Sequence, residues 1–256
     1  MKRILFLGIL GLVFMAADCE REVEPTPGEA IINFKGVYDS EPLVMFAKEY
    51  DYEAGMKVKL QLFQFYISNL ELVSNTSGVE QTVPLSDVEL ISFKEIVDET
   101  AAQQGINLTY TDIPDGKYTQ IRFGLGLTEA LNSTNPSDYT PPHPLDDHYW
   151  SAALGYVFTK IEGNADLEGN GEYTNDGKLT FHSGHNSLYQ ELTFPIDMEI
   201  VGGTVKKINF SVDLHRVLDD GNGNFIDFRE VTQDHTNNPE IYEGIANRLA
   251  TAIAVQ

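Results

Sequence analysis

The sequence predicts an all-β domain, either an antiparallel β-sandwich or a barrel-like fold, that ends in a short C-terminal helix. Three observations support this class. Short segments of alternating apolar and polar residues run through the 256-residue chain, and such alternation is typical of strands with one buried face. Turn signals rich in glycine and asparagine separate these segments. Only two stretches have the residue spacing of a helix.

The clearest strand pattern is VKKINFSVDL at 205–214, in which every second residue from Ile208 onwards is apolar. In 57–66 the apolar residues alternate up to Leu62 and then change phase at Phe63, which predicts a β-bulge. Many short strands at this spacing indicate a sandwich or a barrel. Similar patterns predict further strands at 30–36, 67–73, 87–93, 118–125, 155–161, 178–182 and 190–200.

The two helical candidates lie at 94–104 and near the C-terminus. The second begins at Pro239 and has isoleucine or leucine at every fourth position from 241 to 253. This spacing gives one apolar face, which we expect to pack on the β domain. The main turn signals are Asp115-Gly116, Gly169-Asn170-Gly171, Asn175-Asp176-Gly177, Gly202-Gly203 and Gly221-Asn222-Gly223.

The first residues have the pattern of an export signal. Lys2 and Arg3 precede an apolar run, 4–15, that is too short to cross a bilayer. The single cysteine, Cys19, follows shortly after, as in bacterial lipoproteins that are cleaved before a cysteine and acylated on it. The alternative is ordinary secretory cleavage, with Cys19 an incidental thiol. The predicted organisation is a lipoprotein-type signal at 1–18, a tether at 19–29 and one β domain at 30–256.

Acidic residues outnumber basic ones by 39 to 17, which gives a formal net charge of -22. Such a surface repels phosphate backbones, so the charge excludes nucleic-acid binding and favours cations. One cysteine excludes an internal disulfide framework and cysteine-based zinc sites. The sequence also lacks the GxSxG, HExxH and phosphate-binding glycine-loop motifs. We therefore expect a binding protein rather than an enzyme.

The most informative region is 121–163, which runs from a strand ending in a glycine pair through a proline-rich loop to the aromatic stretch HYWSAALGYVF. Downstream, FHSGH at 181–185 ends a predicted strand in histidine and glycine, and SVDLHRVLD at 211–219 contains a Val-Asp-Leu strand. Together with 65–73, 83–95 and 113–126, this order of motifs resembles the MbnP-like family of bacterial exported copper-binding proteins over most of residues 30–254.

The resemblance implies a β-rich domain that holds copper near a tryptophan, which a partner di-haem cytochrome c peroxidase oxidises to kynurenine in some members. It also implies a place in the cell envelope of a Gram-negative bacterium, as a periplasmic or outer-membrane lipoprotein. Trp150 matches the tryptophan, whereas Ala152 stands where members often have a second one. The alternative for Trp150 is an aromatic residue of the core or its rim. The alternative function is a metal-free cell-surface binding or adhesion module.

Imidazole is the commonest protein ligand for copper, which makes the histidines the candidate ligands. The resemblance favours His182 at a predicted strand end, and His143 and His148 in the proline-rich loop. His185 joins them only if the chain turns, because residues three apart on an extended strand face opposite sides. The alternative is that these are exposed loop histidines. His215 is expected to lie on a strand and to face solvent.

A calcium loop is a further candidate. The segment DGNGNFIDFRE at 220–230 is rich in side-chain oxygens, the ligands that calcium prefers. However, Phe225 stands where an EF-hand loop needs glycine. The alternative is a β-hairpin turn of small polar residues. The candidate calcium ligands are Asp220, Asn222, Asn224 and Asp227.

Overall fold

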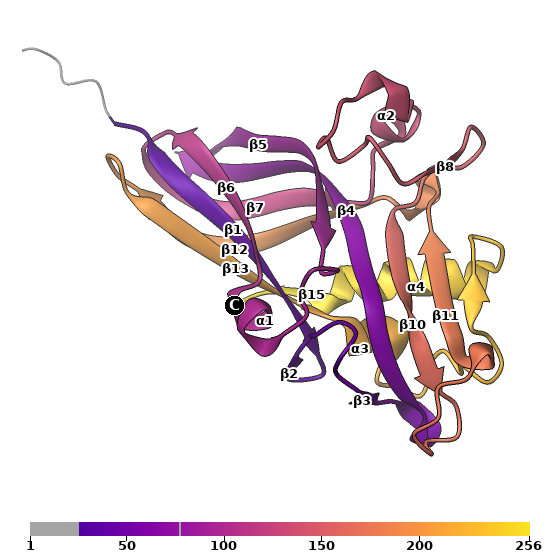
Figure 1. The fold of residues 1–256 in the computed structure, drawn as a ribbon. Coiled ribbons are helices and arrows are strands. Elements are labelled where there is room, and N and C mark those ends of the chain that lie inside the picture. Colours follow the sequence, from indigo (N-terminus) through magenta and orange to yellow (C-terminus); the bar gives the residue numbers. More distant parts are fainter. Residues whose placement is uncertain (1–25, 77) are drawn as a thin grey trace, which may run out of the picture.

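The structure, a computed structural model, describes residues 26–256 apart from Ser77. Strands dominate it, so the predicted all-β class is confirmed. The strands form two open sheets that pack against each other, which is the sandwich arrangement (Figure 1). Cys19 and the predicted signal peptide lie outside the described residues.

The five-stranded sheet has the order β15-β13-β1-β2, with β6 also paired to β1. Strands β1 and β13 run parallel, with Phe34 opposite Phe210, so the expectation of a wholly antiparallel fold is corrected. A parallel pair needs a long crossover, and here the second sheet lies between the two strands in sequence. The strands are β1 (Gly28–Tyr38), β2 (Glu41–Pro42), β6 (Ile106–Ile113), β13 (Val205–Asp213) and β15 (Ile253–Val255).

The eight-stranded sheet has the order β12-β7-β4-β10-β11-β14, with β3 and β5 also paired to β4. Its pairs are antiparallel except for β11 and β14, which run parallel. A two-stranded sheet, β8-β9, stands beside it. The strands are β3 (Tyr50–Asp51), β4 (Lys57–Thr76), β5 (Val79–Ser92), β7 (Gly116–Leu125), β8 (Tyr149–Ser151), β9 (Gly155–Tyr156), β10 (Thr159–Asp166), β11 (Lys178–Ser183), β12 (Gln190–Ile200) and β14 (Gln233–Asp234).

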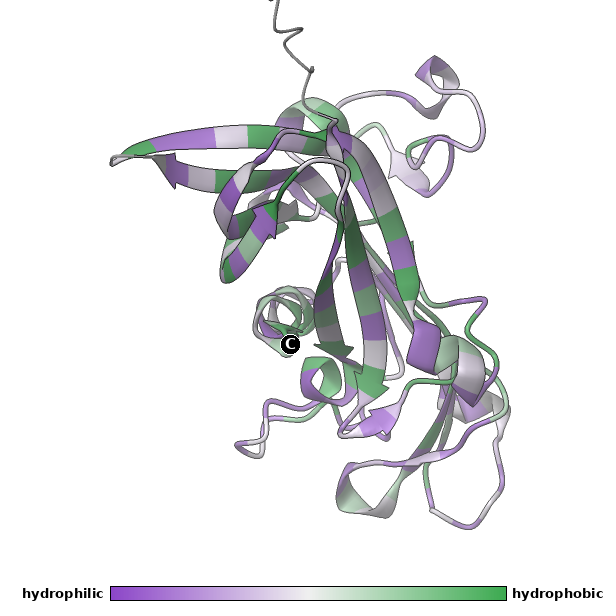
Figure 2. Cartoon of the chain, turned by 90° about the vertical axis from the view of Figure 1, so that its left-hand side faces the viewer, coloured by the Kyte–Doolittle hydropathy of each residue, from purple (hydrophilic) through white to green (hydrophobic). Residues whose placement is uncertain are grey.

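The predicted bulge is present in β4. Glu162 of β10 pairs with Leu62 and the next residue, Gly163, pairs with Leu60, so Gln61 is the extra residue. Beyond it Phe63 takes over the buried face. Figure 2 shows the resulting alternation of hydrophobic and hydrophilic residues along the strands.

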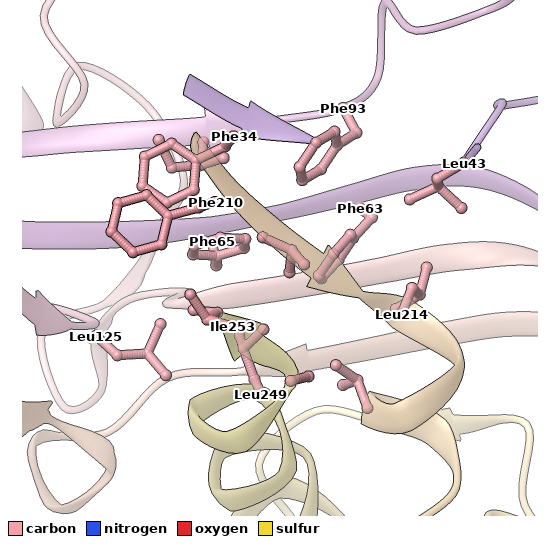
Figure 3. Packing of buried hydrophobic residues seen from close by; sticks show 14 of the residues in the cluster. Phe34, Leu43, Phe63, Phe65, Phe93, Leu125, Phe210, Leu214, Leu249 and Ile253 are labelled. Carbon is pink, nitrogen blue, oxygen red and sulfur yellow. The ribbon is translucent and has the colours of Figure 1, made fainter. Parts of the chain in front are cut away.

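Phenylalanines from both sheets form the centre of the core (Figure 3). Phe34 of β1 stacks on Phe210 of β13 with ring centroids 5.0 Å apart. The same ring meets Phe65 of β4 and Phe123 of β7 edge to face, at 6.4 and 6.2 Å. Such edge-to-face and stacked pairs are favourable aromatic geometries, so these rings join the two sheets.

The predicted C-terminal helix is confirmed as α4, which buries Ile245 and Leu249. The weaker helical candidate, 94–104, is helical only from Glu99, because Asp98 caps the helix by accepting from Ala101 N at 2.8 Å. In the part of the chain that the structure describes, no helix is long and apolar enough to span a membrane. The helices are α1 (Glu99–Gln104), α2 (Glu129–Asn132), α3 (Leu214–Leu218), α4 (Pro239–Ala252) and the 3-10 turns η1 (Glu53–Gly55), η2 (Pro136–Asp138), η3 (Asn175–Gly177) and η4 (Asn186–Leu188).

The expectation for His215 is wrong. The strand ends at Asp213, whose side chain accepts from His215 N at 3.1 Å and caps α3. His215 therefore lies on a helix. Its ring packs against Tyr38 and Tyr52, with centroids 5.0 and 6.1 Å away.

Candidate functional site

The chain between α2 and β10 carries Trp150 and lies at the end of the molecule where β11 ends (Figure 1). Two tyrosines hold this loop. Tyr66 of β4 donates its hydroxyl to Pro144 O at 2.6 Å, and Tyr156 of β9 donates to Leu145 O at 3.0 Å. Leu145 and both tyrosines belong to a second small hydrophobic core. The loop is therefore anchored by a core of its own.

Asn132 at the end of α2 ties this loop to η4. Its Nδ2 donates to Leu154 O at 3.2 Å and to Asn186 Oδ1 at 2.7 Å, and its Oδ1 accepts from Tyr156 N at 2.8 Å. Gly155 has a φ of 73°, and a Cβ there would clash with the Asn132 amide. The Gly-Tyr pair of the aromatic stretch is thus explained by a close approach that only glycine permits.

The FHSGH motif brings the end of β11 against the same loop. Gly184 packs on the Tyr156 carbonyl, where an added Cβ would clash with backbone atoms. On the other side, Thr236 Oγ1 accepts from Gly184 N and donates to His182 O, both at 3.2 Å. The motif therefore fixes the backbone around His182.

Trp150, His182 and His235 form a group that we call the Trp150 cluster. The centroid of the Trp150 ring system is 6.0 Å from that of His182 and 5.2 Å from that of His235, and the two imidazoles are 5.2 Å apart. His235 stands beside His182 because β14 runs parallel to β11 and pairs Asp234 with Phe181. Both imidazoles are half-buried, whereas Trp150 is 43% exposed.

Glu162 orients the ring of His182. Its Oε1 accepts from His182 Nε2 at 2.8 Å, and because that nitrogen carries the proton, Nδ1 keeps a free lone pair. Burial lowers the pKa of His182 more than the hydrogen bond to Glu162 raises it. His182 is therefore neutral near pH 7, the form that binds metal ions. A carboxylate on the remote nitrogen is the usual support of a metal-ligating histidine.

His148 lies next to this cluster, separated from His182 by one lysine. Lys160 pairs with His182 across β10 and β11, and its Nζ lies 2.9 Å from His148 Nδ1. Burial lowers the pKa of both His148 and Lys160. Because the ammonium donates to Nδ1, only Nε2 of His148 is left for another partner.

The other two predicted ligands are held by local contacts. The His143 ring stacks on Tyr139 with centroids 4.1 Å apart, and its Nδ1 accepts from Leu145 N at 3.1 Å. His185 Nδ1 accepts from Ser187 N at 3.2 Å and so caps η4. In both residues, Nδ1 is already engaged.

Of the four histidines predicted as ligands, His182 alone makes ring contact with Trp150 in the described part of the chain. The second histidine of the cluster, His235, was missed. It follows a strand of two residues, and DHTNN has no strand pattern. The residue type was therefore the one signal that the sequence offered.

The two carboxylates of the predicted calcium loop accept hydrogen bonds within the loop. Asp220 accepts from Asn222 N at 2.7 Å and from Asn224 N and Nδ2 at 3.2 and 2.7 Å. The Asp227 carboxylate holds Arg229 through two hydrogen bonds of 2.9 Å. Such contacts are also found in turns built from small polar residues, so the calcium loop stays a prediction.

The sequence profile of the MbnP family matches residues 27–240. The chain belongs to the MbnP family. The matched range of this MbnP-family protein includes Trp150, His182 and His235 and ends at the start of α4. A similar solved structure is MbnP from Methylosinus trichosporium, at 19% identity, with 76% of this chain and 78% of that chain covered and a TM-score of 0.49. No curated protein matches the chain.

Proposed function

We propose that this protein binds a copper ion at the Trp150 cluster. The observation that carries the proposal is the meeting of His182 and His235 beside the single tryptophan of the chain. The centroids of the two imidazole rings are 5.2 Å apart. Membership in the MbnP family supports copper as the metal, since the sequence resemblance implied it.

The residues of the cluster fit copper. His182 is neutral, has a free Nδ1 and is oriented by Glu162, and imidazole suits copper. His235 supplies a second imidazole from an independent segment. The net charge of -22 favours the approach of a cation. His182 and His235 would hold the ion, and bound copper would supply a redox-active centre next to the indole ring.

The exposure of Trp150 supports a partner for this site. A tryptophan residue that is 43% exposed can be reached by another protein, and we propose that this partner is a di-haem cytochrome c peroxidase. We also propose export to the cell envelope and attachment through a lipid on Cys19. The protein itself is proposed to bind and present copper, without catalytic turnover.

The test is copper stoichiometry and affinity, measured by competition with a chromophoric chelator at pH 7.5. With copper supplied as Cu⁺, we expect one ion per wild-type chain and at least a tenfold loss of affinity in His182→Ala and His235→Ala, because each removes one of two imidazoles. The matched control is His185→Asn, since asparagine still caps η4. It should bind as the wild type does.

The outcomes separate the ligand sets. Unchanged binding in His182→Ala would remove the Trp150 cluster as the site, and loss of copper in His185→Asn would restore the ligand set predicted from the sequence. A wild-type chain that takes up no copper would favour the metal-free binding module. Trp150 provides a second signal, because copper held at this cluster should quench its emission.

A further inference from the structure

A second group of metal-ligating side chains lies away from the Trp150 cluster. Glu53 of η1, His215 of α3 and Asp219 each bring one ligand atom to within 4.8 Å of the other two. His215 and Asp219 are neighbours because Asp219 N donates to His215 O across one helical turn, at 2.8 Å. In the described part of the chain, no other His, Asp, Glu or Cys residues form a group of three with this spacing.

The distance between His215 and Glu53 suits a shared metal ion better than a direct hydrogen bond between the two side chains. His215 Nε2 lies 3.8 Å from Glu53 Oε1, which is too far for a hydrogen bond. Two ligand atoms on a tetrahedral zinc ion, each about 2.0–2.2 Å from it, are roughly 3.3–3.6 Å apart. A contraction of a few tenths of an ångström therefore brings His215 and Glu53 to the spacing of two zinc ligands, and the ligand atom of Asp219 lies within 4.8 Å of both.

The ligands are held in place before any ion binds. The imidazole of His215 packs against Tyr38 and Tyr52, and Tyr52 anchors the end of α3 by donating its hydroxyl towards Leu218 O at 3.1 Å. Asp219 is 7% exposed, and its Oδ1 accepts from Gly221 N at 3.0 Å. Among the described residues, its second oxygen accepts no hydrogen bond, which leaves this atom for an ion.

The surroundings favour a cation. His215 lines an open pocket of about 400 Å³ whose walls carry four carboxylates and one amine, Lys57. Tyr38 also lines it, and its hydroxyl is buried without a hydrogen-bond partner among the described residues. A water on an ion at His215 would give this hydroxyl a partner. The four carboxylates are Asp39, Glu41, Glu49 and Asp51.

We propose that Glu53, His215 and Asp219 form a binding site for a divalent transition-metal ion, with Zn²⁺ as the best fit. Imidazole nitrogen and carboxylate oxygen are both zinc ligands, and with three protein ligands a fourth position stays open to water. The set has no sulfur, which a soft cuprous ion prefers. The bound ion ties η1 to α3, and the site is independent of copper binding at Trp150.

The test is calorimetric titration of the chelator-treated chain with ZnCl₂ at pH 7.5. The background variant is His182→Ala, so that zinc does not bind at the Trp150 cluster. We expect one Zn²⁺ per chain, and at least tenfold weaker binding in Glu53→Gln and Asp219→Asn. The matched control is Asp51→Asn, which removes a carboxylate of the same pocket whose side chain is 92% exposed.

Two results would overturn the zinc proposal. One is an equal loss of zinc affinity in Asp51→Asn and Glu53→Gln, which would show diffuse attraction to an acidic pocket. The other is the absence of stoichiometric zinc binding. Glu53 is the less buried ligand, so its variant should fold even where Asp219→Asn does not. In addition, Co²⁺ should give intense visible bands of tetrahedral cobalt in the background variant, and these should be lost in Glu53→Gln.

Discussion

At the scale of single residues, burial shifts the pKa of His182 and of its two neighbours, His148 and Lys160. Desolvation is the largest influence on the pKa of His148, His182 and Lys160, and it lowers all three. An acidic protein would by its charge alone raise these values. Local desolvation outweighs that charge because salt screens exposed charges beyond about 8 Å at physiological ionic strength.

We therefore expect the fold to become less stable as the pH falls below neutral. Because the folded-state pKa values of His148 and His182 lie below the unfolded value of about 6.5, the unfolded chain takes up more protons as the pH falls through that value. We expect the free energy of unfolding to decrease between pH 7.5 and 5.5, and His148→Gln to flatten this dependence. Urea unfolding at several pH values measures it. His185→Asn serves as the control, and a wild-type slope in His148→Gln would contradict the prediction.

At the scale of elements, the sequence predicted what local patterning controls. Alternation located most of the long strands, and the phase change near Phe63 located the bulge, because both depend on side chains two residues apart. Capping was overlooked: Asp213 ends the strand before His215 and begins α3. Strand β6 and the parallel partner of β11 were missed, since pairing between distant segments leaves little trace in either segment. The FHSGH motif was found, but its structural reason was not.

The structural reason for the FHSGH motif can be tested at Gly184. An added Cβ would clash with the carbonyl of Tyr156 and crowd the backbone of Val157, so the end of β11 would have to move. We expect Gly184→Ala to destabilise the fold by about 1–3 kcal/mol, the usual cost of overpacking, and to weaken copper binding because His182 shifts. The matched control is Gly202→Ala, where a Cβ meets nothing within 4 Å. Equal melting temperatures for the two variants would refute this account.

At the scale of the whole molecule, the candidate copper site joins three segments that are remote in sequence. Trp150 comes from the anchored loop, His182 from β11 and His235 from the chain after β14. Composition and charge predicted a cation-binding protein, and the family resemblance selected Trp150 and His182. Their meeting with His235 depends on the parallel pairing of β14, a tertiary contact, which is why the sequence could not supply the second imidazole.

The net charge bears on the proposed attachment of this protein to a membrane. Cleavage before Cys19 would remove two basic residues and one acidic residue from a chain that already carries a charge of -22, so electrostatics oppose binding to anionic lipids. Acyl chains on Cys19 are then the expected attachment, and more than one chain is needed for stable anchoring. We expect the wild type to fractionate with membranes. It should resist washing with about 1 M salt, a concentration that screens electrostatic attraction beyond about 3 Å. Cys19→Ser should move the protein into the soluble fraction. Membrane association that persists in Cys19→Ser, or that salt removes from the wild type, would rule out the lipid anchor.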